Sequence, residues 1–345
     1  MSVAKQLLID TRRAIFDKGD QLELGRKHRP KYSIVAFVAI LALLGMVVIF
    51  TISPGQNWQG DASAQNYFML RQFAYLAVGA IAFVVASRVS LNFMRKMVWI
   101  LLLLAFASCV LLAVAGALNL SIAVDANGAN RWLNFGLVGF QPAELMKFSI
   151  MLFTASFLMN ARARGELNMV RRTLLPIIAI TLLALAMVVG LQSDLSSGAV
   201  ILALVIAQLI ISGMCWRNIL IGVTPFLAGG VLAIGVASYR MSRITTFLEG
   251  CTNLDDQICR SLMALGSGGV FGKGLGQGTG GFGWVQEAIN DGIFPIIGET
   301  FGYAGALIVL AIFVALLFRI LNLAEYLPNL FLRLVVAGVF GWIAS

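Results

Sequence analysis

The sequence has very little charge for its length. Only 12% of its 345 residues are Asp, Glu, Lys or Arg, 59% are hydrophobic, and the mean hydropathy is +0.90. A soluble domain of this size needs far more charge to cover its surface. Apolar stretches of roughly 18 or more residues recur along the chain, and each is long enough to cross a bilayer as a helix. The composition therefore excludes an ordinary soluble protein.

Two further features are missing. The apolar segments do not alternate apolar and polar residues, as the strands of an outer-membrane barrel would. We expect no cleavable signal, because a polar segment precedes a first apolar run that is too long for a signal core. We therefore predict an all-α polytopic membrane protein, a multi-span helical bundle. The predicted spans cover residues 33–53, 68–87, 97–118, 142–160, 173–191, 195–214, 218–238 and 293–318.

Basic residues favour one side of these spans. With the basic segment 1–32 in the cytoplasm, the short loops on that side carry most of the arginines, as the positive-inside rule requires. Orientation in the membrane thus explains the net charge of +9, which gives no reason to expect nucleic acid as a partner. The predicted inner residues are Arg88, Arg95, Lys96, Arg162, Arg164, Arg171, Arg172, Arg217, Arg319 and Arg333. The predicted outer residues are Arg71, Arg131, Arg240, Arg243, Arg260 and Lys273. They either bind substrate or make interfacial contacts and local ion pairs.

We predict a single transmembrane domain over residues 33–345. The last apolar run, 334–343, is too short to cross the membrane, so we expect eight complete spans and a ninth in which the chain is cut. Two outer stretches, 119–141 and 239–292, are longer than simple connectors. The second contains apolar patches and glycine-rich turns, and we expect it to fold at the membrane surface with short helices.

The second outer stretch holds two cysteines and a glycine-rich segment. Cys251 and Cys259 either close a small disulfide loop in an oxidising compartment or remain free. The glycine-rich segment 266–279 is not a Walker A loop, which needs Gly where Ser267 stands and Ser or Thr where Gly274 stands. It is either a structural turn or a backbone that approaches a ligand closely.

Several acidic residues lie in or beside the spans. Glu144 and Lys147 are three residues apart, so they share a helix face and can pair; intramembrane charges of this kind either serve function or lock a bundle. Asp194 lies between two spans and is expected to cap the second of them. For Glu299, within the eighth span, we expect an outer arginine as partner.

Glu287 and Asp291 are the strongest catalytic candidates. They are four residues apart just before the eighth span, so in a helix both carboxylates point the same way. Such a carboxylate can act as general base on a sugar hydroxyl. The alternative is a pair of solvated acids near a helix N-terminus, where negative charge is favourable.

Five landmarks resemble those of a known family, and they occur in its order. They are Arg71-Gln72; Asn130-Arg131-Trp132 before Gln141-Pro142-Ala143-Glu144-Leu-Met-Lys147; Gln192-Ser193-Asp194-Leu195; the glycine-rich stretch from Ser261 to Gly278; and Glu287-Ala-Ile-Asn-Asp291-Gly-Ile-Phe294 with Gly298-Glu299. In these residues the chain resembles the shape, elongation, division and sporulation family, which includes FtsW, RodA and SpoVE. The departures are Ala143, Ser193, Gln286 and Gly292, and none of them removes a charged position.

The resemblance implies ten spans and a peptidoglycan glycosyltransferase of the bacterial cytoplasmic membrane, with the division branch favoured over elongation. Such an enzyme polymerises lipid II on the outer face, together with a class B penicillin-binding protein and other division or elongation proteins. The residue matching Asp291 is the family's essential catalytic acid or base, and Glu287 either orients it or has a second catalytic role.

The substrate's diphosphate requires positive charge or a divalent cation beside it. The predicted substrate-binding residues are Arg131, Arg71, Arg243, Lys147, Glu144, Lys273 and Asp194. Mg²⁺ or Mn²⁺ is an open possibility, with Asp291 as a candidate ligand, and no organic cofactor is expected. Two other functions remain: a lipid II flippase, for which no internal repeat is evident, and a non-catalytic division scaffold, for which the outer carboxylates would be dispensable.

Overall fold

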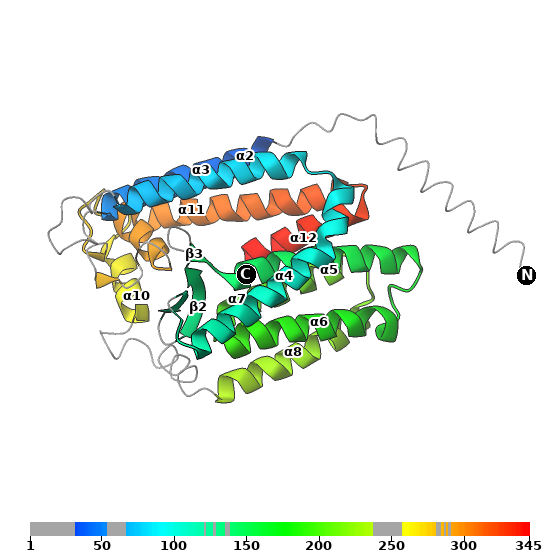
Figure 1. Cartoon of the computed structure of the whole chain (residues 1–345). Coiled ribbons are helices and arrows are strands. Elements are labelled where there is room, and N and C mark those ends of the chain that lie inside the picture. Colours follow the sequence, from blue (N-terminus) through cyan, green and yellow to red (C-terminus); the bar gives the residue numbers. More distant parts are fainter. Residues whose placement is uncertain are drawn as a thin grey trace, which may run out of the picture.

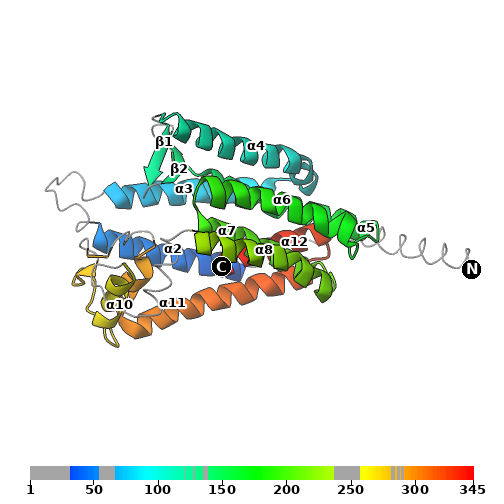
Figure 2. The ribbon, with the colours of Figure 1, turned by 90° about the horizontal axis from the view of Figure 1, so that it is seen from below.

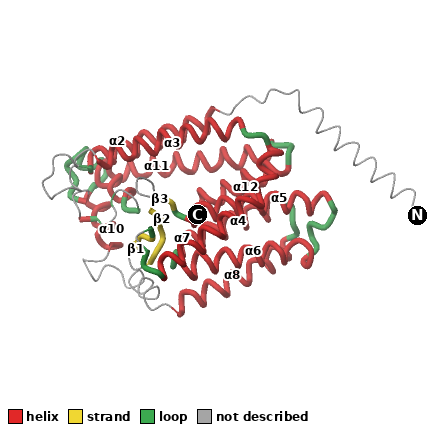
Figure 3. Tube along the Cα trace, viewed as in Figure 1, coloured by secondary structure: helices red, strands yellow, loops and turns green. Residues whose placement is uncertain are grey.

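The computed structural model describes residues 32–53, 67–120, 122–126, 129–134, 139–236, 257–280, 284–285, 288 and 291–345. Long helices run along the molecule, and a short helix and a small sheet lie at one end of it (Figures 1 and 3). The described elements are α2 (Tyr32–Ile52), α3 (Tyr67–Arg88), α4 (Leu91–Ala117), β1 (Ala123–Ala126), β2 (Ala129–Asn134), β3 (Gly139–Phe140), α5 (Pro142–Ala163), η3 (Val170–Leu174), α6 (Leu175–Leu185), η4 (Ala186–Leu191), α7 (Leu195–Ile211), α8 (Trp216–Val236), α10 (Gln257–Ser267), α11 (Ile293–Tyr326) and α12 (Leu330–Ala344).

The helices follow the predicted spans closely. Among the described residues, six helical segments are long and apolar enough to cross a membrane, and α7 and α12 are shorter apolar helices. Polar residues set several of the starts: Ser90, Asp194 and Asn329 cap α4, α7 and α12 through their side chains, and Pro142 occupies the first turn of α5. Long apolar runs ended by caps explain why hydropathy locates these elements well.

The predicted fifth span is less regular than its composition suggests. Its middle, α6, is an α-helix, but both flanks, η3 and η4, are π-helical. The extra residue per turn in a π-helix shifts the side chains that follow to another face, and such turns are frequent at functional sites. Nothing in the apolar sequence of this span marks where the winding changes.

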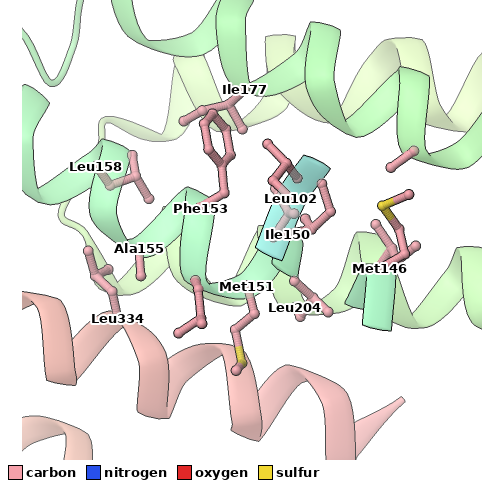
Figure 4. Packing of buried hydrophobic residues seen from close by; sticks show 14 of the residues in the cluster. Leu102, Met146, Ile150, Met151, Phe153, Ala155, Leu158, Ile177, Leu204 and Leu334 are labelled. Carbon is pink, nitrogen blue, oxygen red and sulfur yellow. The ribbon is translucent and has the colours of Figure 1, made fainter. Parts of the chain in front are cut away.

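The main core lies between α4, α5, α6, α7 and α12. Leu102 of α4, Ile150 of α5 and Leu204 of α7 are buried there and lie close together (Figure 4). Helix α12 packs closely on its neighbours through glycine, because a Cβ at Gly338 would collide with Met151 of α5. Small residues at helix crossings are a common way of bringing membrane helices together.

A second core joins α2, α10 and α11. Val48 and Ile52 of α2 are buried with Ala264 of α10 and with Ile296 and Val309 of α11. Helix α3 packs against α2 and buries none of its span, so its large apolar side chains are exposed. Exposed apolar side chains on membrane-length helices fit contact with lipid.

One end of the bundle is strongly basic, and polar contacts tie it together. Arg95 donates to Asn329 Oδ1, Arg162 donates to the carbonyl of Ser212, and the Cys215 backbone N–H donates to Asn168 Oδ1. The α3–α4 and α5–η3 connections lie at this end, on the right in Figure 1, and Arg88, Arg95, Arg162 and Arg172 lie in or beside them. The basic N-terminal segment, residues 1–31, lies outside the described residues.

The opposite end carries the sheet and α10, as Figures 1 and 2 both show. The first outer stretch forms an antiparallel sheet in the order β1-β2-β3, with an irregular register between Val124 and Asp125. These strands were not predicted from the sequence. In the second outer stretch, α10 confirms the expected short helix and packs on α11.

Candidate active site

Asp194 is a buried carboxylate at the start of α7. Its Oδ1 accepts hydrogen bonds from the Ser197 backbone N–H at 3.0 Å and the Ser196 hydroxyl at 2.8 Å, and its Oδ2 accepts one from Gln141 Nε2 at 3.2 Å. Burial raises the pKa of the carboxyl, but these serine hydrogen bonds and the charge of Arg131 lower it by more, so the pKa lies below its usual value. The predicted capping role of Asp194 is confirmed.

Arg131 extends from β2 toward the turn before α7. Its guanidinium donates to the carbonyl of Ser193 at 3.2 Å, which brings β2 and this turn together. The Nε of Arg131 is buried and has no hydrogen-bond partner among the described residues. A buried N–H without a partner is costly in a folded protein, and an anionic group beside it would remove that cost.

Glu144 and Lys147 form an ion pair in the first turns of α5. Lys147 Nζ lies 2.6 Å from Glu144 Oε1, as their spacing predicts, and the Lys147 side chain is 7% exposed against 50% for Glu144. The ammonium also lies over the ring of Trp342 in α12, 5.1 Å from its centroid. The pair and the ring hold a cation near the end of the bundle that carries the sheet.

Glu299 is almost completely buried in α11 and accepts several hydrogen bonds. Its Oε1 accepts from Lys273 Nζ at 2.9 Å and from the Thr279 backbone N–H at 2.8 Å, and its Oε2 accepts from the Gly280 backbone N–H at 2.8 Å. The hydroxyls of Ser267 and Thr279 lie 3.3 Å from Oε1. The expected arginine partner is wrong: the ion pair is with Lys273, which the glycine-rich segment brings to the carboxylate.

A break in α11 explains how that segment is held. Gly302 has φ 73° and ψ −176°, which interrupts the helix. The broken turn pairs with the glycine-rich segment instead: the N–H of Lys273 donates to the carbonyl of Glu299, and the N–H of Tyr303 donates to the carbonyl of Gly269, both at 2.9 Å. A Cβ at Gly272 would collide with the backbone of α11. Glycine is needed in this segment for close backbone contact with α11. This favours a structural turn over a backbone that approaches a ligand.

Asp291 lies in a turn immediately before α11 and is exposed. Of the acidic side chains described at this end of the bundle, Glu144, Asp194 and Glu299 all have polar partners, whereas no hydrogen bond or ion pair joins Asp291 to another described residue. A solvent-accessible carboxylate without a partner is free to accept a proton from a substrate.

The other predicted site residues are described only in part. Glu287, Arg243 and Cys251 lie outside the described residues, and Cys259 is buried and disulfide-bonded. Arg71 lies in the first turns of α3, where its Nε donates to the Tyr75 hydroxyl at 2.8 Å. No hydrogen bond or ion pair among the described residues joins Asp291 to Arg131 and Asp194, to the Glu144–Lys147 pair or to the Lys273–Glu299 pair.

Sequence reasoning missed several partners of these groups. Gln141 stands beside the conspicuous Pro142 and was treated only as part of a motif. Trp342 lies in the last apolar run, where nothing distinguishes it from lipid-facing residues. The backbone donors Thr279 and Gly280 carry no chemical signal in a sequence, because every residue except proline has an N–H.

The described residues define a polytopic helical membrane protein with partly buried ion pairs and, among these residues, one unpaired carboxylate at the same end of its bundle. The family model for the cell cycle proteins FtsW, RodA and SpoVE matches residues 31–345. The chain therefore belongs to the FtsW/RodA/SpoVE family.

Individual relatives agree with this assignment. The chain is 32% identical over 311 residues to the probable peptidoglycan glycosyltransferase FtsW of Dichelobacter nodosus, covering 88% of this chain and 76% of that one. It is 29% identical over 327 residues to stage V sporulation protein E of Bacillus subtilis, covering 92% and 86%.

Two solved structures share the fold. A chain of a peptidoglycan synthase complex that coordinates polymerisation and crosslinking matches with a TM-score of 0.66, at 24% identity over 90% of this chain and 83% of that one. The rod shape determining protein RodA of Thermus thermophilus matches with a TM-score of 0.60, at 24% identity over 90% and 81%.

Proposed function

We propose that this protein is a peptidoglycan glycosyltransferase that polymerises lipid II into glycan strands. The curated relative from Dichelobacter nodosus carries that activity in its name, and the chain covers most of its length. The observation that carries the chemistry is Asp291, an exposed carboxylate with no polar partner in the described part of the chain, at the end of the bundle where other charged side chains gather.

In this proposal, the end of the bundle that carries the sheet and Asp291 faces the outside of the cell. The distribution of basic residues supports this orientation, since cytoplasmic loops of membrane proteins carry an excess of Lys and Arg. The opposite end holds Arg88 and Arg95 at the connection between α3 and α4, and Arg162 and Arg172 around the connection between α5 and η3. The protein would then lie in the bacterial cytoplasmic membrane with its N-terminus inside.

Asp291 would act as the general base. As the acceptor hydroxyl attacks the anomeric carbon of the donor sugar, the carboxylate takes the hydroxyl proton, the glycosidic bond forms and the bond from that carbon to the diphosphate oxygen breaks. One displacement of this kind inverts the anomeric centre and needs no second nucleophile. The exposure of Asp291 lets the proton pass to solvent before the next cycle.

The departing diphosphate carries the negative charge, and cationic groups would stabilise it. Arg131 is the first candidate because its buried Nε has no partner among the described residues. Lys147 is the second, held by Glu144 and Trp342. The described residues bring no three metal-ligating side chains together, and the steps above use no metal. A divalent cation with Asp291 among its ligands stays a prediction.

A class B penicillin-binding protein is the proposed partner, supported by the fold shared with a chain of a peptidoglycan synthase complex. The test is to supply the purified full-length chain and this partner with fluorescent lipid II, and in parallel to measure lipid II translocation in liposomes. We expect long glycan strands and no translocation. Translocation without strands would support a flippase, and neither activity would support a scaffold.

A further inference from the structure

A cavity separates α4 from η4 at the end of the bundle that carries the candidate active site. Its volume is about 260 Å³, and β2 closes one side of it. Apolar walls and uncharged polar groups share its surface: Leu112, Ala113 and Leu191, with Asn130, Gln192 and Ser193. No charged side chain lines it among the described residues, so it is not suited to a phosphate or carboxylate.

One polar group in this cavity has unused hydrogen-bonding capacity. Gln192 is 1% exposed, and its Nε2 donates to Cys109 Sγ at 3.2 Å. Its Oε1 is buried and has no hydrogen-bond partner among the described residues. An unpaired buried carbonyl is unfavourable, and a native protein normally pairs such a group with water or with a ligand. A hydroxyl or amide N–H entering the cavity would satisfy it.

The cavity adjoins the residues expected to bind substrate. Ser193 lines it and also accepts the hydrogen bond from Arg131, and Asp194 follows directly. Ser193 has φ 52°, a backbone conformation that is uncommon for a residue other than glycine, and η4 before it is π-helical. A ligand whose charged group contacts Arg131 can therefore extend a neutral group toward Gln192.

We propose that this cavity is a subsite for one neutral sugar ring of the glycan substrate, an inference that rests on the proposed function. Its volume lies just below the range of whole-ligand pockets, roughly 300–1,000 Å³, so it accommodates a part of a large substrate. A sugar ring presents apolar C–H faces, which match Leu112, Ala113 and Leu191. Its hydroxyl and acetamido groups match the amides of Asn130 and Gln192.

The first arm of the test fills the cavity. Ala113→Leu places a larger side chain on the cavity wall, and Ala107→Leu makes the same change on an exposed face of α4. We expect Ala113→Leu to raise the KM for lipid II about tenfold, because the leucine side chain would prevent the sugar ring from making roughly one buried hydrogen bond and the packing contacts around it. The kcat and the melting temperature should stay unchanged. Ala107→Leu should match the wild type. An unchanged KM in Ala113→Leu would overturn the proposal.

The second arm measures occupancy without relying on turnover. Ala113→Cys, in a chain that also carries Cys215→Ser and Asp291→Asn, is modified with methyl methanethiosulfonate, a small neutral reagent. Lipid II should slow modification at position 113 at least about fivefold, whereas undecaprenyl diphosphate should not.

Equal protection by both lipids would identify a groove for the lipid chain, and protection by neither would identify a cavity that holds only water. Either result overturns the subsite. Suppose instead that lipid II alone protects position 113 but the wild-type protein makes no glycan strands. That combination would support the sugar subsite and contradict the polymerase function. A failure of the subsite proposal can therefore be distinguished from a failure of the proposed function.

Discussion

Lys273 is the residue whose interpretation changes most between sequence and structure. The sequence places it among the outer cations that bind substrate, whereas in the fold its ammonium pairs with the buried carboxylate of Glu299. The side chain is 33% exposed and Glu299 is 1% exposed, so removing the cation leaves a buried carboxylate with only neutral donors. This arrangement favours a structural role for Lys273.

We predict that Lys273→Met lowers the free energy of unfolding by about 1–2 kcal/mol, a value discounted for the partial exposure of the lysine. Lys96→Met serves as the control, because Lys96 is exposed at the other end of the bundle. Unfolding in detergent measures the stability, and the KM for lipid II is measured alongside. Unchanged stability with a raised KM would return Lys273 to the substrate-binding residues.

At the scale of single residues, the partners of Asp194 and Glu144 were predicted from the sequence, whereas the partner of Glu299 was predicted wrongly. The cap by Asp194 and the pair of Glu144 with Lys147 depend on neighbours within three residues, so helix geometry alone indicates them. The partner of Glu299 comes from a segment 26 residues earlier. Which cation reaches a buried acid from that distance depends on how the intervening chain folds.

At the scale of elements, the break in α11 and the glycine-rich segment form one unit. The carbonyls of Glu299 and Thr300 and the N–H groups of Tyr303 and Ala304 have lost their helical partners, and the segment supplies replacements. Satisfying all four groups allows an interrupted helix to persist inside a membrane protein. The unit fixes the position of the helix that begins just after Asp291.

Gly302→Ala should disrupt this unit. A side chain at φ 73° is strained, and its Cβ would lie within 2.6 Å of the backbone of Val270, Phe271 and Gly272. We expect a loss of roughly 3 kcal/mol or more in the free energy of unfolding, since strain and backbone overlap add together.

Gly79→Ala in α3 is the matched control, because nothing lies within 4 Å of a Cβ there. Alanine's higher helix propensity should leave that variant as stable as the wild type or slightly more stable. Unfolding curves for both proteins in the same detergent provide the comparison. Equal stability of Gly302→Ala and the wild type would contradict the paired-backbone account.

The elements show where sequence reasoning stops. Long apolar runs predicted the membrane helices, because the hydrocarbon thickness sets their length. The kink at Gly302, the π-helical flanks η3 and η4 and the three-stranded sheet were not predicted. Each of these features depends on tertiary contacts, which select one of several backbone conformations that the local sequence allows. A single glycine within an apolar run does not indicate that the helix is interrupted there.

At the scale of the whole molecule, the bundle separates two chemical environments. One end is basic and held by arginine-to-carbonyl contacts, and the other carries the sheet, α10, the partly buried ion pairs and Asp291. The distribution of charge along the sequence predicted this division. It could not predict which of the described candidate site residues pair with one another and which do not, because spacing along the chain does not determine distances across an end of the bundle.

The proposed polymerase mechanism depends most on Asp291 as the catalytic base. The most direct test is the rate of glycan polymerisation from lipid II by wild type, Asp291→Asn and Glu325→Gln, each purified with the transpeptidase partner. Glu325 is an exposed acid at the opposite end, so its variant controls for loss of a surface charge. We predict that Asp291→Asn loses at least about 100-fold in rate while keeping its melting temperature and partner binding, and that Glu325→Gln behaves as wild type. Wild-type rate and strand length in Asp291→Asn would contradict the proposed mechanism.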